Sequence, residues 1–288
     1  MGTLHIVATP IGNLEDITLR ALRVLKEVDV IAAEDTRVTR KLLSRYDIHT
    51  PLISYHQHSR GRRAEEIVEM LREGKHVALV SDAGTPGISD PGHELIGMCV
   101  SEGMSIDIVP GPTAIVAALV LSGLPTTHFA FDGFPPRKAS ERAAFFKSLK
   151  HERRTVCLYE APLRLEKTLV TMLAELGDRR VAIVREVTKR FEEVFRGSVT
   201  EAMERFAQKK PRGEIVIVVE GASLDDVSQS PPAAADLRAR LVELIEAGLT
   251  ERDAIRQCMI EFKLPKRVVY EAAIRFKADR EPSAEPQT

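Results

Sequence analysis

Residues 81–92 read Ser-Asp-Ala-Gly-Thr-Pro-Gly-Ile-Ser-Asp-Pro-Gly and connect a β-branched run, His76–Ser81, to a helical pattern, Gly92–Glu102. Glycine lets a backbone pass close to a ligand, proline fixes a turn, and the exposed amides of such a loop can donate hydrogen bonds. In open α/β sheets, ligands bind beyond the carboxyl ends of the strands. We therefore expect this loop to form one side of a ligand site.

The alternation of strand and helix extends in both directions from this loop. Alternation at this spacing favours a mostly parallel sheet with helices on both faces, and we assign residues 1–123 to this first α/β lobe. Its predicted strands are Leu4–Ala8, Val28–Ala33, Leu52–Tyr55, His76–Ser81 and Ser105–Val109, and its predicted helices are Ile17–Glu27, Thr36–Arg45, Arg63–Arg72, Gly92–Glu102 and Thr113–Ser122.

A second α/β lobe is predicted for residues 124–221, where the same kinds of pattern continue. Its predicted strands are His128–Asp132, Thr155–Glu160, Val181–Val187 and Glu214–Glu220, and its predicted helices are Ser140–Lys150, Leu163–Leu176 and Val199–Gln208.

The C-terminal part differs in composition from both lobes. Residues 222–235 are rich in Ser, Asp, Pro and Ala, which is typical of a linker. Residues 236–277 are predicted to form a small appendage of three helices, and Thr250 with Asp253 resembles a capping box at the start of the second helix. The polar residues 278–288 are predicted to be a disordered tail.

Three loops rich in Gly and Pro follow predicted strands of the first lobe. They are residues 9–16, 81–92 and 110–114. Each loop alone could be a tight turn, but three loops at equivalent ends of neighbouring strands favour a shared ligand cleft.

Several other functional classes lack their motifs. The sequence contains neither GxxxxGK[ST] nor GxGxxG, which argues against phosphate-loop and ordinary dinucleotide sites, and it has no GxSxG nucleophile elbow. The pairs His56/His58 and Glu34/Asp35 are too sparse to predict a metal site. We therefore expect a ligand site without a metal.

Composition favours a globular protein of the cytoplasm. Hydrophobic residues make up 44% and charged residues 29%, and the formal net charge of -1 means that any polyanion site requires local clustering. No apolar run is long enough to span a bilayer, and the N-terminus lacks the features of a signal peptide. We therefore expect no membrane partner. The 3 cysteines are odd in number and far apart, so we expect neither a disulfide framework nor a zinc site.

With these motifs, the sequence resembles the tetrapyrrole-methylase superfamily and, within it, the ribosomal RNA small subunit methyltransferase I family. The resemblance covers roughly residues 4–221, and the 81–92 block is highly specific to it. Further matching blocks are Ala8–Leu14, Ala33–Arg37, Val109–Ala114, Tyr159–Pro162 and Arg185–Lys189.

The resemblance implies a two-lobed class III methyltransferase that binds S-adenosyl-L-methionine between its lobes and forms a homodimer. It implies methylation of the ribose 2′-hydroxyl of a decoding-centre cytidine in 16S rRNA of the small ribosomal subunit. By position in the family's motifs, the residues expected at the cofactor are Pro10, Ser81, Asp82, Ala83, Thr85, Thr113, Ala114, Tyr159, Glu160 and Val187.

The candidate catalytic residues lie in these matching blocks. A positioned base could accelerate attack by a weakly nucleophilic hydroxyl, and Glu160, Glu186 and Asp35 are the candidates, with Lys189 orienting the hydroxyl or a phosphate. A structural ion pair is an equal alternative for each of them.

RNA contacts require local positive charge. Residues 137–154 contain seven Lys or Arg against two acidic residues, and smaller clusters are Arg60/Arg62/Arg63 and Lys263/Lys266/Arg267. These clusters favour phosphate contacts, although a solvated face is the alternative. Two competing functions remain open: a methylase of the same fold acting on a tetrapyrrole or a protein side chain, and a non-catalytic ribosome assembly factor.

Overall fold

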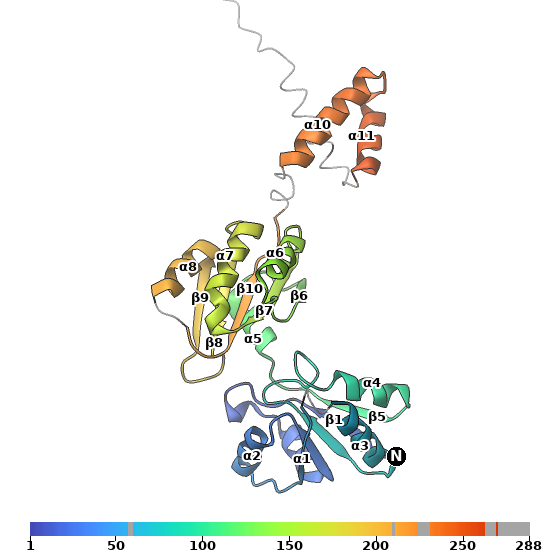
Figure 1. Cartoon of the computed structure of the whole chain (residues 1–288), viewed down its shortest axis with the longest axis vertical. Coiled ribbons are helices and arrows are strands. Elements are labelled where there is room, and N and C mark those ends of the chain that lie inside the picture. Colours follow the sequence, from blue (N-terminus) through green and yellow to red (C-terminus); the bar gives the residue numbers. More distant parts are fainter. Residues whose placement is uncertain (57–59, 209–210, 224–230, 263–268, 270–288) are drawn as a thin grey trace, which may run out of the picture. The chain divides into compact units, whose positions relative to one another are not determined.

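The computed structural model describes residues 1–56, 60–208, 211–223, 231–262 and 269. None of the helices within these ranges is both long and apolar enough to cross a membrane. Two compact units make up the chain, Met1–Glu220 and Gly221–Thr288 (Figure 1).

The first sheet was predicted to be mostly parallel, and all of its strand pairs are parallel, in the order β3-β2-β4-β1-β5. Both faces of this sheet are buried, as the alternating residues of β4 show. Val77 and Leu79 pack into one core with α3 and α4. Ala78 and Val80 pack into the core on the opposite face, with α1 and α2. The strands are β1 Thr3–Val7, β2 Val30–Ala33, β3 Leu52–Ser54, β4 Val77–Val80 and β5 Ser105–Val109, and the helices are η1 Leu14–Asp16, α1 Leu19–Glu27, α2 Thr36–Arg45, α3 Arg60–Arg72 and α4 His93–Ser101.

The second sheet is mixed, with order β6-β7-β10-β8-β9. Only the β6–β7 pair is parallel, and the other three pairs are antiparallel. Helices α6, α7 and α8 supply residues to the core on one face of the sheet. The strands are β6 Phe129–Phe131, β7 Thr155–Glu160, β8 Arg180–Arg185, β9 Glu193–Ser198 and β10 Ile215–Val219, and the helices are α6 Ala139–Ser148, η3 Pro162–Arg164, α7 Leu165–Leu176 and α8 Val199–Gln208.

Strand β9 has no counterpart in the predicted strands. Its sequence, EVFRGS, carries charge and a glycine, which weakens any local strand signal. Pairing with β8, from Arg180 opposite Ser198 to Arg185 opposite Glu193, supplies the hydrogen bonds that make it a strand. The predicted strand Val181–Val187 is also too long, because Glu186 has a φ of 53° and ends β8 at Arg185.

Helix α5, Ala114–Ser122, packs on the second sheet, although the lobe boundary predicted at 123/124 places it in the first lobe. Ile115, Ala118 and Leu119 are buried in a core that also contains residues of β7, β8 and β10. The apolar sequence AIVAALVLS does not specify which sheet the helix covers. The connection between the two sheets is therefore part of the second core.

The Gly221–Thr288 unit contains a helical pair, α10 Pro231–Glu246 and α11 Glu251–Glu261, whose facing apolar residues form a small core. Helix α10 begins at Pro231, inside the segment predicted as a linker. Thr250 accepts a hydrogen bond from the Asp253 amide and caps α11 as predicted. Apart from residue 269, the predicted third helix and the predicted tail lie outside the described residues.

Candidate active site

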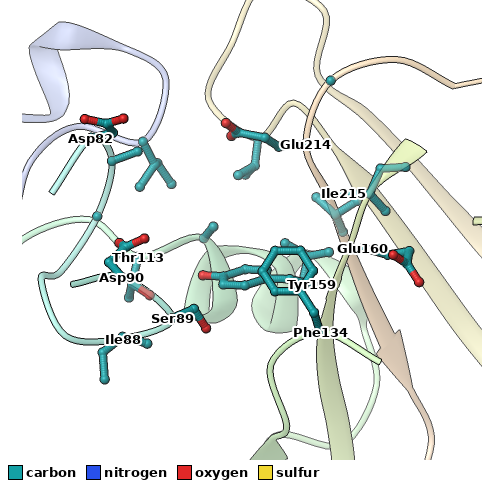
Figure 2. A pocket seen from close by; sticks show the side chains of 18 of the residues that line it. Asp82, Ile88, Ser89, Asp90, Thr113, Phe134, Tyr159, Glu160, Glu214 and Ile215 are labelled. Carbon is teal, nitrogen blue, oxygen red and sulfur yellow. The ribbon is translucent and has the colours of Figure 1, made fainter. Parts of the chain in front are cut away.

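A cavity of about 530 Å³ lies where the loops of the first sheet meet the strands of the second (Figure 2). Its volume is typical of small-molecule sites. All three Gly/Pro-rich loops contribute, as predicted, and the loop after β2 contributes Glu34. The remaining residues of the first-sheet side are Ile11, Asp82, Ala83, Gly84, Thr85, Ile88, Ser89, Asp90, Thr113 and Ala114.

The second sheet closes the cavity with a largely apolar wall. Tyr159 packs against Phe131 and Phe134, with ring centroids 5.0 and 5.4 Å away. Val184 from β8 and Ile215 from β10 extend this wall. Such a surface suits a flat, partly apolar ligand, while the loops opposite supply polar groups.

Backbone hydrogen bonds hold the 81–92 loop against the first loop. The Thr9 amide donates to the Gly84 carbonyl at 2.9 Å, and the Gly84 amide donates to the Thr9 carbonyl at 3.0 Å. Gly84 has a φ of 85°, and Ser89 has a φ of 62°, a left-handed conformation that costs a serine free energy. A strained residue in a cavity wall is a common feature of functional sites.

Most of the residues expected at the cofactor line the cavity. Pro10 and Ser81 do not: both are buried beneath its wall, and the Ser81 hydroxyl donates toward the Gly84 carbonyl at 3.3 Å. Gly111 also lies outside the lining. A Cβ added at Gly111 would lie 2.9 Å from the Cβ of Ala8, so the glycine allows the chain to pass close to the residue that follows β1. The expected residues in the lining are Asp82, Ala83, Thr85, Thr113, Ala114, Tyr159, Glu160 and Val187.

The carboxylate of Glu160 points away from the cavity (Figure 2). Successive strand residues face opposite sides of a sheet, so Tyr159 faces the cavity and Glu160 faces α7. There the buried carboxylate accepts hydrogen bonds from the Thr168 hydroxyl and, at 2.8 Å, the Ala161 amide, and it pairs with Arg164 at 3.2 Å. These contacts indicate a structural ion pair, contrary to the predicted catalytic role.

Asp35 caps helix α2 and does not line the cavity. Its carboxylate accepts a hydrogen bond from the Arg37 amide at 2.8 Å and pairs with the Arg37 guanidinium at 2.6 Å. The hydrogen bonds from Arg37 lower the pKa of Asp35 to about 2. A carboxylate of such low pKa is a poor proton acceptor near neutral pH.

Glu186 and Lys189 form a fixed pair at the turn between β8 and β9. The Glu186 carboxylate accepts hydrogen bonds from the Glu214 amide at 2.9 Å and from Lys189 Nζ at 3.0 Å. Burial acts to raise the pKa of Glu186, but these hydrogen bonds outweigh it and the net shift is downward. Lys189 also pairs with Glu214 at 3.0 Å, and these contacts favour the structural alternative for both predicted residues.

Asp90 was missed as a site residue, although it lies inside the 81–92 block. It lines the cavity, and burial raises its pKa to about 6, assisted by the negative charge of Glu34 and opposed by hydrogen bonding from Ser81. Burial likewise raises the pKa of Tyr159 to about 12, with the charge of Asp90 as the next cause. Two partly buried titratable groups with raised pKa values in one cavity are typical of a functional site. No sequence motif distinguishes Asp90 from an ordinary loop carboxylate.

Comparison with known proteins places these features in a family. The family model described as Tetrapyrrole (Corrin/Porphyrin) Methylases matches residues 3–203. A Ribosomal RNA small subunit methyltransferase I from Synechocystis is 46% identical over 280 residues, which cover 97% of this chain and all of that protein. A relative of the same name from Thermotoga maritima is 52% identical over 221 residues, covering 77% of this chain and 99% of that protein.

Solved structures share the fold at lower identity. A cobalt precorrin-4 methyltransferase has a TM-score of 0.58 and 20% identity, covering 76% of this chain and 94% of that chain. A uroporphyrin-III C-methyltransferase from Thermus thermophilus, complexed with S-adenyl homocysteine, has a TM-score of 0.55 and 20% identity, covering 76% of this chain and 97% of that chain. The predicted tetrapyrrole-methylase-like fold is thereby confirmed. The chain belongs to the ribosomal RNA small subunit methyltransferase I family, within the tetrapyrrole methylases.

Proposed function

We propose that this chain transfers a methyl group from S-adenosyl-L-methionine to the ribose 2′-hydroxyl of a decoding-centre cytidine in 16S rRNA. The observation that carries the proposal is the cavity itself: eight residues that the resemblance assigns to the cofactor line one space between two sheets. The near full-length similarity to the Synechocystis relative supports the ribosomal RNA as substrate.

The cavity residues fit this methyl donor. Small side chains at Ala83, Thr85 and Ala114 leave backbone groups accessible, and the apolar wall around Tyr159 suits a flat base. Four carboxylates, those of Glu34, Asp82, Asp90 and Glu214, make the lining negative, which complements the positive sulfonium and ammonium groups of the donor. The donor supplies a methyl group on a positively charged sulfur, an excellent leaving group, so the proposed reaction requires no metal.

The exposed basic residues of the 137–154 cluster are proposed to contact RNA phosphates. Arg142 is excluded from this role, because it is buried and donates a hydrogen bond to the Arg137 carbonyl at 3.1 Å. Arg154 is paired with Glu152 at 2.7 Å, whereas Lys147 and Arg153 are exposed on the surface. The Lys263/Lys266/Arg267 cluster lies outside the described residues.

We propose that the protein acts in the cytoplasm as a homodimer. The outer side of α5 supports self-association: the helix is apolar all round, and Val116 and Val120, one turn apart, are 48% and 68% exposed. A helix that is hydrophobic on all sides is normally covered on all sides. Val120→Asp is expected to reduce the mass measured by light scattering from that of a dimer to that of a monomer.

Methyl incorporation from labelled donor tests the function. Isolated small ribosomal subunits, naked 16S rRNA and a porphyrinogen are each incubated with the protein. Labelling of the subunits at the ribose of one cytidine is the expected result. Labelling of the porphyrinogen alone would overturn the RNA assignment, and labelling of naked RNA as fast as subunits would refute a preference for the assembled particle.

Deletion of the Gly221–Thr288 unit tests its proposed role in docking on RNA. The Met1–Glu220 unit contains the whole cavity and its own cores. The truncated protein is expected to bind the methyl donor normally but to methylate subunits more slowly. A wild-type rate on subunits would show that the C-terminal unit does not serve in docking.

A further inference from the structure

Residues 186–192 form the turn between β8 and β9, and its backbone has an unusual conformation. Glu186 and Thr188 have φ values of 53° and 65°, in the left-handed region that residues other than glycine rarely adopt. A Cβ added at Gly213 would overlap the Glu186 carboxylate, so the neighbouring chain passes very close to the turn. Left-handed residues of this kind cost folding free energy and persist only where surrounding contacts impose them.

Three side-chain contacts impose this conformation. Glu192 accepts a hydrogen bond from the Thr188 amide at 2.8 Å, and Lys189 pairs with Glu214 at 3.0 Å. The Thr188 hydroxyl accepts a hydrogen bond from the Asn13 amide at 3.2 Å, which ties the turn to the loop after β1. The turn is therefore braced by both sheets' loops and has a fixed shape.

Two exposed side chains, Arg190 and Phe191, lie on this braced turn. The ring of Phe191 is 67% exposed, and the guanidinium carbon of Arg190 lies over it, 5.6 Å from the ring centroid. Arg190 is itself exposed. The same turn contains Val187, which lines the cavity. An aromatic ring and a cation are thus presented to solvent on a turn that begins at the cavity.

An exposed aromatic ring beside an arginine has the chemistry of a surface that binds an unpaired nucleotide. A nucleobase stacks on an aromatic ring or a guanidinium plane, and the positive charge attracts the adjoining phosphate. A single exposed apolar residue is ordinary on a protein surface. Phe191 differs from such a residue because a strained and braced turn holds it, and backbone strain of this kind clusters at functional sites.

We propose that Phe191 and Arg190 form a stacking platform for an unpaired RNA base next to the methylated nucleotide. The choice of RNA as the occupant rests on the function proposed above. Phe191 receives the base on its exposed ring, and Arg190 contacts a phosphate of the same strand. Both are positioning residues: by holding the strand outside the cavity, they direct the neighbouring ribose into it.

The first experiment measures the binding of two RNA strands that differ only in their bases. The probes are oligocytidylate of about ten nucleotides and an abasic strand with the same ribose-phosphate backbone. The wild-type protein is expected to bind oligocytidylate more tightly than the abasic strand. Phe191→Ala is expected to lower the oligocytidylate affinity by roughly 5- to 10-fold, the lower part of the range for base–aromatic stacking because the ring is partly exposed, and to leave the abasic affinity unchanged.

Further substitutions separate stacking from general apolar contact and from folding defects. Phe191→Tyr keeps an aromatic ring and should retain the wild-type affinity for oligocytidylate. Phe191→Leu keeps an apolar side chain without a ring and should bind as weakly as Phe191→Ala. The matched control is Val100→Ala on α4, where the valine is 65% exposed, and it should bind both strands like the wild type.

The second experiment tests Arg190 and links the platform to methylation. Arg190→Gln removes one phosphate contact, so it should weaken the binding of both strands and make the slope of log affinity against log salt shallower by about 0.7. In methylation of small ribosomal subunits, Phe191→Ala should raise the subunit KM by a factor similar to its loss of oligocytidylate affinity. Affinity for the methyl donor should not change, because neither residue lines the cavity.

Distinct outcomes separate the platform from the proposed function. If the wild type methylates subunits and Phe191→Ala keeps the wild-type subunit KM, the function stands and the platform is refuted. Equal wild-type affinities for the two strands would refute it as well. A raised subunit KM with unchanged oligocytidylate affinity would replace the RNA base by a ribosomal protein as the occupant. If the wild type prefers oligocytidylate through Phe191 but methylates no subunits, the proposed function fails and the platform stands.

Discussion

In the all-parallel sheet, loops follow the carboxyl ends of β1, β2, β4 and β5 and enter the cavity, and no strand residue of that sheet is part of the described lining. The mixed sheet, by contrast, lines the cavity with residues of β7, β8 and β10 together with residues of the adjoining loops. Two acidic residues illustrate this difference. Asp90 of the first part is partly buried among negative charges, while Glu160 of the second is paired with Arg164 in the core. The comparison separates a loop carboxylate whose charge lies at the cavity from a strand carboxylate whose charge is neutralised in the core.

Of the substitutions predicted here, removal of the Glu160 side chain is expected to have the largest effect. It should lower the free energy of unfolding and leave the rate of methyl transfer nearly unchanged. Glu160→Ala leaves Arg164 and the Thr168 hydroxyl without their partner, and loss of one member of a buried pair costs about 3–5 kcal/mol of unfolding free energy. Because Arg164 is 23% exposed, the lower end of that range is expected. Urea denaturation measures the loss of unfolding free energy. The control is Glu166→Ala, an exposed position on α7, the helix that also carries Thr168. A large loss of rate in folded Glu160→Ala would contradict the scaffolding role.

A substitution in the loops of the parallel sheet is expected to lower the affinity for the methyl donor instead. Gly84→Val places a branched residue at a φ of 85°, where strain costs about 1–3 kcal/mol and displaces the loop that lines the cavity. Calorimetry is expected to show donor affinity reduced by roughly tenfold or more. Gly103→Val introduces similar strain at a φ of 66° in an open turn outside the cavity, and it is expected to leave donor affinity unchanged. Equal affinity losses in the two variants would indicate general destabilisation.

Removal of the Asp90 charge is expected to raise the free energy of unfolding, whereas removal of Glu160 is expected to lower it. Its folded pKa of about 6 lies above the ordinary 3.8, so its stabilising contribution is complete below 3.8 and is lost as pH rises through about 6. Asp90→Asn should therefore stabilise the protein at pH 8, by on the order of 1–2 kcal/mol after solvent screening, and much less at pH 4. Thermal melts of both proteins at the two pH values measure this difference. Destabilisation by Asp90→Asn at pH 8 would show that the carboxylate is a structural partner.

The smallest effect is expected at the exposed surface beside the mixed sheet. Arg153→Glu reverses one exposed charge of the 137–154 cluster, and it should raise the KM for subunits a few-fold at low salt, with a smaller effect at high salt. Donor affinity should not change. Lys26→Glu, an exposed reversal at the end of α1, is the matched control. An equal rise in KM for both variants would point to net charge as the cause.

Local sequence was sufficient for much of the fold and for the loops of the site. Thr36–Arg45 and Ser105–Val109 have the predicted bounds, because each carries its own periodicity and end signals. Thr250 caps α11 through a contact with Asp253, three residues away. The 81–92 loop enters the cavity because glycine and proline restrict the backbone at their own positions.

Other features depended on partners distant in the sequence. Helix α5 is apolar on all sides, and only its contacts in the folded chain assign it to the second sheet. Strand β9 exists because β8 pairs with it. Asp90 and Glu160 are chemically similar in the sequence, yet Asp90 is partly buried near other carboxylates and Glu160 is fully buried beside Arg164 and Thr168. Burial and charge environment set a pKa and a role, and both depend on which distant side chains the fold brings within a few ångströms.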